Sequence, residues 1–144
     1  MVRQLLLGIC AKLLVMGFLI FMGLMFGVVD ERGEISAMHK GVPQNDLGIR
    51  SDVLNNIKKS LGIKMLVRSM SPRVIIADEI GTSEDASAIQ YALSSGVKGI
   101  FTAHGSSLED LKANPIFREM FSLNLFERVI VLDSDVKGKI KEIA

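Results

Sequence analysis

The stretch Arg73-Val-Ile-Ile-Ala-Asp78-Glu79-Ile-Gly81 decides the fold of this chain. The apolar run Val74 to Ala77 does not alternate with polar residues, so it predicts a strand that is covered on both faces. The two carboxylates that follow cannot both be buried without a cation, donors or water, because desolvation of each charge is costly. Two interpretations fit: a strand tip that holds a metal-bound phosphate in a nucleotide hydrolase, or a strand that ends in a solvated acidic turn.

Length and composition favour a single domain and argue against a nucleic-acid partner. The chain has 144 residues, enough for one domain with a substantial core. With 17 basic and 16 acidic residues the net charge is +1, and no basic stripe predicts nucleic-acid binding. Cys10 is the single cysteine, so no intrachain disulfide can form, and no Cys/His cluster has zinc spacing.

Residues 1–29 differ in composition from the rest of the chain. The segment from Leu13 to Val29 carries no charge, and only Arg3 and Lys12 are charged before it. Its length lies at the lower end of the about 17–25 residues that cross a bilayer as a helix. Two interpretations therefore stay open for residues 5–29: a membrane anchor, or a buried helix followed by a buried strand.

Helical and strand patterns alternate along the chain. Helices are expected near 3–16, over 52–69 with an interruption at Gly62, from Thr82 to about Gly96, and after Ser107. Ser107 and Asp110 have the spacing of a helix cap. Strands are expected near 24–29 and at 73–78, 97–102, 128–132 and 139–143. Thr82 and Asp85 have the spacing of a capping box. The alternation predicts an α/β fold with a mainly parallel sheet.

Polar groups follow three of the predicted strands. They belong to Asp30-Glu31-Arg32, Asp78-Glu79 and Thr102-Ala103-His104. Ligands bind outside the carboxyl ends of parallel strands, so we expect these groups to converge there as metal-binding acids, a base and a phosphate-contacting histidine. Arg50 and Arg68 are either arginines that neutralise a transferred phosphoryl group across a subunit boundary or members of surface ion pairs.

The chain resembles the C-terminal part of the stage III sporulation protein AA family, ATPases of endospore-forming bacteria that belong with the RecA-like secretion and pilus-retraction ATPases. The matching segments occur in order and with sensible spacing; they are Gly27–Ile35, Pro43–Leu54, Leu66–Gly81, Thr102–Gly105 and Phe126–Val131. The resemblance implies a RecA-like P-loop NTPase core with a mainly parallel sheet, lacking its N-terminal phosphate-loop strand. It divides the chain into an apolar helix plus strand over 1–29 and the C-terminal half of an ATPase domain over 30–144.

The resemblance also implies roles for the acidic residues. Asp30 and Glu31 correspond to the acidic box, with Asp30 binding the cofactor and Glu31 acting as the base or water-orienting group. Asp78 and Glu79 correspond to the Walker B pair. Asp78 would hold Mg²⁺ through water, and Glu79 would be catalytic.

Further roles are implied for basic residues, cofactors and partners. His104 corresponds to the histidine box, and Arg50 and Arg68 fall where related ATPases place catalytic arginines that reach a neighbouring subunit's nucleotide. ATP and Mg²⁺ are the implied cofactors. A homo-oligomer, hexameric in the intact family, is implied on the cytoplasmic face of a membrane channel complex between mother cell and forespore.

The phosphate-binding loop of such ATPases is missing from these 144 residues. No G-x-x-x-x-G-K-[ST] occurs, and Gly8-Ile-Cys-Ala-Lys12 does not supply one. That loop contributes N–H groups and a lysine to the phosphates, so we expect the chain to bind no ATP or Mg²⁺ alone. Loss of the central strand that leads into the loop would also expose backbone ladder groups in the sheet.

Three functional interpretations follow. The first is a fragment or truncated member of the family, inactive alone, whose intact form couples ATP hydrolysis to channel assembly. The alternative is a non-catalytic interaction subunit, anchored in the membrane through residues 5–29, that docks on an intact ATPase. A metal-dependent hydrolase unrelated to ATP is the third.

Overall fold

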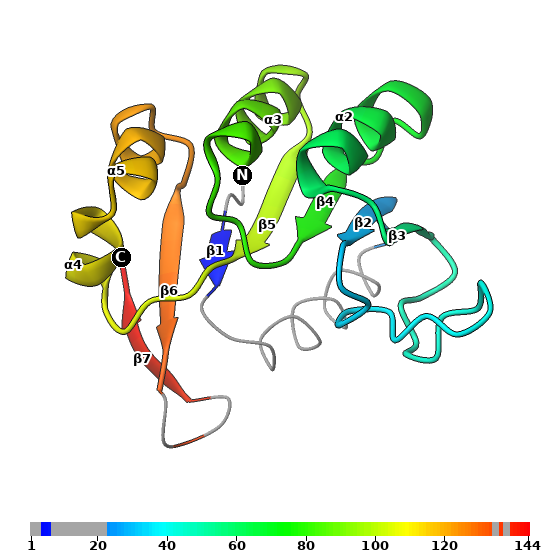
Figure 1. The fold of residues 1–144 in the computed structure, drawn as a ribbon, viewed down its shortest axis with the longest axis horizontal. Coiled ribbons are helices and arrows are strands. Elements are labelled where there is room, and N and C mark those ends of the chain that lie inside the picture. Colours follow the sequence, from blue (N-terminus) through cyan, green and yellow to red (C-terminus); the bar gives the residue numbers. More distant parts are fainter. Residues whose placement is uncertain (1–3, 7–22, 134–135, 137–138) are drawn as a thin grey trace.

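The computed structural model describes residues 4–6, 23–133, 136 and 139–144. These residues form one seven-stranded sheet in the order β3-β2-β4-β5-β1-β6-β7 (Figure 1). The strands are β1 (Gln4–Leu6), β2 (Phe26–Asp30), β3 (Ser51–Asn55), β4 (Val74–Ala77), β5 (Lys98–Thr102), β6 (Arg128–Leu132) and β7 (Ile140–Ile143). Neighbouring strands are parallel except for β6 and β7. The predicted α/β fold with a mainly parallel sheet is confirmed.

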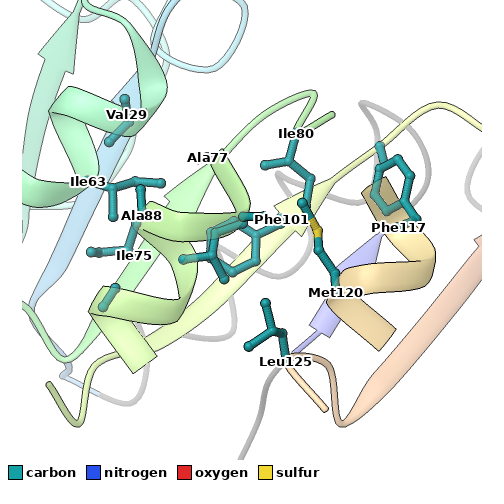
Figure 2. Close-up of a cluster of buried hydrophobic side chains, with 14 of the residues drawn as sticks. Val29, Ile63, Ile75, Ala77, Ile80, Ala88, Phe101, Phe117, Met120 and Leu125 are labelled. Carbon is teal, nitrogen blue, oxygen red and sulfur yellow. The ribbon is translucent and has the colours of Figure 1, made fainter. Parts of the chain in front are cut away.

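Helices cover one face of the sheet. They are α2 (Lys59–Ser69), α3 (Ser83–Ser94), α4 (Leu108–Ala113) and α5 (Pro115–Ser122), and Figure 1 shows α2, α3 and α5 side by side above the strands. The main core lies under them, and Figure 2 shows part of it, including Ile75 and Phe101 from the sheet and Met120 from α5. The helices therefore exclude water from that face of the strands.

The strand β4 is buried on both faces, as its apolar run predicts. Ile75 and Ala77 belong to the core under the helices, whereas Val74 and Ile76 belong to a second cluster. That second cluster includes Ile35 and Leu47 from the loop between β2 and β3, together with Phe26, Val28 and Ile100. The loop that follows Asp30 therefore packs on the sheet and is positioned by its own apolar residues.

The prediction of a helix near 3–16 is wrong where it can be checked. Gln4–Leu6 is a strand that pairs with β5 on one side and β6 on the other, and this pairing outweighs the local helical pattern. Residues 7–16 lie outside the described residues. The sequence predicted that a missing central strand would expose ladder groups; in the described sheet β1 lies between β5 and β6 and pairs with both.

The prediction of one helical region over 52–69 is also wrong in its first part. Ser51–Asn55 pairs along β2 as an edge strand, and α2 begins only at Lys59. Gly62 does not interrupt that helix. A Cβ built on Gly62 would lie 2.6 Å from Cγ1 of the buried Val29, so glycine allows α2 to approach β2 closely.

Replacing Gly62 with alanine is expected to destabilise the fold. The added methyl must displace the fully buried Val29, an overpacking cost of about 1–3 kcal/mol, against a helix-propensity gain of about 0.5–1 kcal/mol. Urea unfolding measures the difference. Gly81→Ala is the matched control, since a Cβ there meets no described atom within 4 Å. Equal stability of the two variants would contradict the close approach of α2 to β2.

Helix ends follow the predicted capping. The Thr82 hydroxyl accepts from the Asp85 N–H at 3.1 Å, and the Asp85 carboxylate accepts from the Thr82 N–H at 3.1 Å, which confirms the capping box. Ser107 caps α4 through the Asp110 N–H. Helix α5 was not predicted separately, although Asn114-Pro115 is a typical helix start and Asn114 caps it.

The predicted alternatives for residues 5–29, a membrane anchor or a buried helix and strand, concern mainly residues that the structure does not describe. Of residues 5–29, those from 7 to 22 lie outside the described set. Within the part that the structure does describe, no helix has both the length and the apolar character needed to cross a membrane. The predicted strand near 24–29 is present as β2.

Candidate functional site

A cleft of about 450 Å³ lies at the carboxyl ends of β2, β4 and β5. Its lining includes Glu31, Glu79 and His104, which come from the three strand ends that the sequence predicted to converge. The wall also includes residues at the starts of three helices: Lys58 and Lys59 of α2, Gly81, Thr82 and Asp85 at α3, and Asn114 and Phe117 at α5. The volume is in the range of small-molecule sites, about 300–1,000 Å³.

Asp30 ends β2 and is fully buried. Its carboxylate accepts from the N–H groups of Ile35 at 3.2 Å and Ser36 at 2.8 Å, and from the Ser36 hydroxyl at 2.5 Å. It does not line the cleft in the described structure. Asp30 therefore closes the loop that carries Glu31 and Arg32 toward the cleft.

Glu31 is paired with a buried lysine. The Lys59 Nζ donates to Glu31 Oε2 at 2.7 Å, with the two side chains 10% and 37% exposed. The Lys59 hydrogen bond lowers the pKa of Glu31 below its ordinary 4.5, against the opposing effect of desolvation. A lowered folded-state pKa means that this contribution to stability is present above pH 4.5 and is lost as pH falls through the lowered value.

Glu79 carries two partners from neighbouring strand ends. Its carboxylate forms an ion pair with Arg32, and Oε1 lies 3.2 Å from Nε2 of His104. Glu79 is 26% exposed, whereas the side chains of Arg32 and His104 are mostly in solvent. The arrangement places one carboxylate between two groups that can donate hydrogen bonds to an anion.

The backbone of Glu79 is held in an unusual conformation. Its φ of 47° lies in the left-handed region, which a residue with a Cβ adopts only where surrounding contacts impose it. The end of β5 provides them: Thr102 Oγ1 accepts from the Glu79 N–H at 3.0 Å, and the Thr102 carbonyl accepts from the Ile80 N–H at 2.8 Å. Thr102 therefore fixes the backbone conformation of the turn that contains Glu79.

Asp78 directly follows β4 and is 1% exposed. It does not line the cleft in the described structure, whereas Glu31 and Glu79 do. Within the described ranges no three His, Cys, Asp or Glu side chains form a group that could hold a metal ion. Mg²⁺ in nucleotide sites takes one or two carboxylates and completes its shell with phosphates and water. The cleft carboxylates Glu31 and Glu79 are oxygen donors of the kind that Mg²⁺ takes, and in this structure each is paired with a cationic side chain of the protein.

Arg50 and Arg68 lie at the opposite edge of the sheet from the cleft. Arg50 precedes the amino end of β3, and its Nη1 donates to the Gly23 carbonyl at 3.0 Å. Arg68 is in the last turn of α2, the helix that starts at the cleft. Both are exposed. The structure brings together Glu31, Glu79 and His104, but it does not bring these arginines to the same cleft.

Sequence reasoning missed two residues that shape the site. Lys59 gives no site signal when 52–69 is predicted to be one helical region, although two consecutive lysines are an unusual start for a helix. The sequence identifies Thr102 only as part of a strand tip, because a contact between its hydroxyl and the N–H of Glu79, 23 residues away, has no local sequence signal.

Comparison with known proteins identifies the family. The sequence model described as "Sporulation stage III, protein AA" matches residues 6–144. Stage III sporulation protein AA of Bacillus subtilis (strain 168) is 45% identical over 112 residues, which are 78% of this chain and 36% of that protein. The chain thus spans about a third of the length of this relative.

Solved structures share the fold at low sequence identity. The VirB11 ATPase of the Brucella suis type IV secretion system, in complex with sulphate, is 16% identical with a TM-score of 0.68, over 99% of this chain and 48% of that one. The pilus retraction motor PilT with bound ADP is 15% identical with a TM-score of 0.59, over 100% and 46% of the two chains. At these identities the likeness concerns the RecA-like fold alone. On the extent of the family match, this chain belongs to the sporulation stage III protein AA family.

Proposed function

We propose that this chain supplies the carboxylate and histidine groups of an ATP-hydrolysing site. The observation that carries the proposal is the convergence of Glu31, Glu79 and His104 on one cleft at the carboxyl edge of the sheet. Ligands of open α/β sheets bind at this edge. Family membership supports the same reading of the acidic and histidine motifs.

Each group has a role that its surroundings suit. Glu79 and Glu31 are the carboxylates that orient or accept a proton from the attacking water, since both face the cleft. His104, mostly exposed and 3.2 Å from Glu79, can turn from that carboxylate to a terminal phosphate. Mg²⁺, when bound with the phosphates, would neutralise their charge. Asp78 would hold it through water only if the cleft opened toward this side chain, since Asp78 is buried outside the cleft lining here.

The intact enzyme is proposed to be a homo-oligomer, a hexamer in the family, on the cytoplasmic face of a membrane channel complex. Arg50 and Arg68 support this, because both are exposed at the edge opposite the cleft. They do not line the cleft of their own chain, and as exposed side chains they are accessible to a cleft on a neighbouring subunit. In that assembly, hydrolysis would support formation of the channel between mother cell and forespore.

Mg-ATP is expected not to bind saturably to the 144-residue chain at sub-millimolar concentration. The physical reason is that these residues contain no G-x-x-x-x-G-K-[ST] segment to neutralise the phosphates. Isothermal titration calorimetry measures this directly. Clear saturation that Asp78→Ala abolishes would show that the chain holds nucleotide without the loop, and the prediction would then be wrong.

The proposed function itself is tested in a chimera. The matched part of this chain replaces the corresponding 112 residues of the Bacillus subtilis relative. Turnover of ATP by the chimera is expected if the cleft residues form a competent half-site. A folded chimera that binds ATP but never hydrolyses it, beside an active parent, would overturn the proposal.

A further inference from the structure

The start of helix α2 breaks the usual charge rule for helices. Its N-cap is Lys58, which makes no side-chain capping bond, its first residue is Lys59, and its first turn contains no acidic residue. The positive end of the helix dipole disfavours cations at these positions. Helices α3 and α4 of the same chain obey the rule, with two acidic residues in each first turn. Helix α5 has no acidic residue in its first turn either, but among these four helices α2 is the one that starts with two lysines, and a local rule broken in this way points to a use for the charge.

The two lysines differ in their surroundings. Lys58 is 59% exposed and lies 3.3 Å from Glu84, a surface ion pair of a kind that contributes little. Lys59 is buried, and its ammonium group meets the Glu31 carboxylate at 2.7 Å. A buried ammonium group is costly unless it is paired, so Lys59 requires Glu31.

The contact between Lys59 and Glu31 is held by rigid elements on both sides. Gly62 seats the first turn of α2 against Val29 of β2, one turn from Lys59. On the other side, Asp30 closes the loop after β2 through three hydrogen bonds. Glu31 thus lies between the packed first turn of α2 and the loop closed by Asp30, and its carboxylate has a defined place on the cleft wall.

We propose that Lys59 is a positioning residue, which holds the Glu31 carboxylate as an anion in the cleft. The proposal rests on the proposed function for what Glu31 does, but not for the contact itself. The lowered pKa of Glu31, caused first by the Lys59 hydrogen bond, agrees with it. The other charged or titratable groups that face the cleft near Glu31 are Arg32, Lys58, Glu79, Asp85 and His104.

The test is a pH titration of the Glu31 side-chain carboxyl carbon by NMR in the full 144-residue chain. Lys59→Met keeps the apolar stem and removes the charge, so the Glu31 midpoint is expected to shift upward. Lys59→Arg is expected to keep the midpoint low. Lys58→Met is the matched control and is expected to leave it unchanged, because Lys58 pairs with Glu84.

An unchanged Glu31 midpoint in a folded Lys59→Met chain, or an equal shift in Lys58→Met, would overturn the proposal. Should Lys59→Met fail to fold, the Lys59 ammonium ¹⁵N signal provides the second test. That signal is expected in the native chain and lost in Glu31→Gln; its persistence in Glu31→Gln would contradict the pairing. None of these measurements uses nucleotide, so they stay decisive even if the chimera shows no turnover.

Discussion

Asp30→Ala is expected to destabilise the folded chain by about 3–5 kcal/mol, because it leaves two buried N–H groups and a hydroxyl without their acceptor, at about 1–3 kcal/mol for each unsatisfied group. Asp30 is fully buried, and its carboxylate accepts all three hydrogen bonds that close the following loop. Without it, the N–H groups of Ile35 and Ser36 are left buried and unsatisfied. Urea unfolding gives the free energy of unfolding, and hydrogen exchange of the Ser36 amide reports the loop.

Ser36→Ala is the matched control for Asp30→Ala. It removes the hydroxyl bond at 2.5 Å and keeps both backbone bonds to the carboxylate. A smaller loss, about 1–2 kcal/mol, is expected. If Asp30→Ala cost no more than Ser36→Ala, the carboxylate would not be the anchor of the loop. Asp30 would then be available to bind the cofactor, as the family resemblance implied.

Glu79→Gln in the chimera is expected to lower ATP turnover on the order of 10²–10⁴-fold, the usual contribution of a positioned acid or base. The amide keeps the shape of the side chain and one oxygen for Arg32 or His104, yet it cannot take a proton from water. The left-handed backbone at Glu79 is maintained by Thr102 in both forms. A steady-state hydrolysis assay, with nucleotide binding measured in parallel, separates lost chemistry from lost affinity.

Glu84→Gln is the control for this loss of turnover. Glu84 is 59% exposed on α3, and its carboxylate pairs with the surface residue Lys58, so turnover is expected to be unchanged. Full activity of Glu79→Gln combined with inactivity of Glu31→Gln would assign the base to Glu31. Equal losses in Glu79→Gln and Glu84→Gln would point to a general effect of charge on the chimera.

The sequence predicted much of the fold because its strongest signals are local. The apolar run Val74 to Ala77 is the buried strand β4, and the Thr82 capping box starts α3. The predictions failed where a partner elsewhere decides the conformation. Gln4–Leu6 is a strand because β5 and β6 flank it, and Ser51–Asn55 is a strand because it pairs with β2.

The candidate site also has features that the sequence predicts and features that only the tertiary structure shows. Placing Glu31, Glu79 and His104 at one edge required only that the strands run parallel, which the alternating pattern of helices and strands predicts. Which atoms meet required the tertiary structure. The Arg32 contact with Glu79 and the Thr102 contact with its N–H join residues from different strand ends.

By itself, then, the sequence determined a parallel α/β sheet with acids and a histidine at its carboxyl edge. Periodicity and capping depend on near neighbours in the chain, so one sequence can reveal them. Only the tertiary structure decided that Asp30 serves its own loop, that Lys59 meets Glu31, and that Arg68 lies at the far edge. Those outcomes depend on how closely packed elements approach one another, and such distances are set by contacts between residues far apart in the chain.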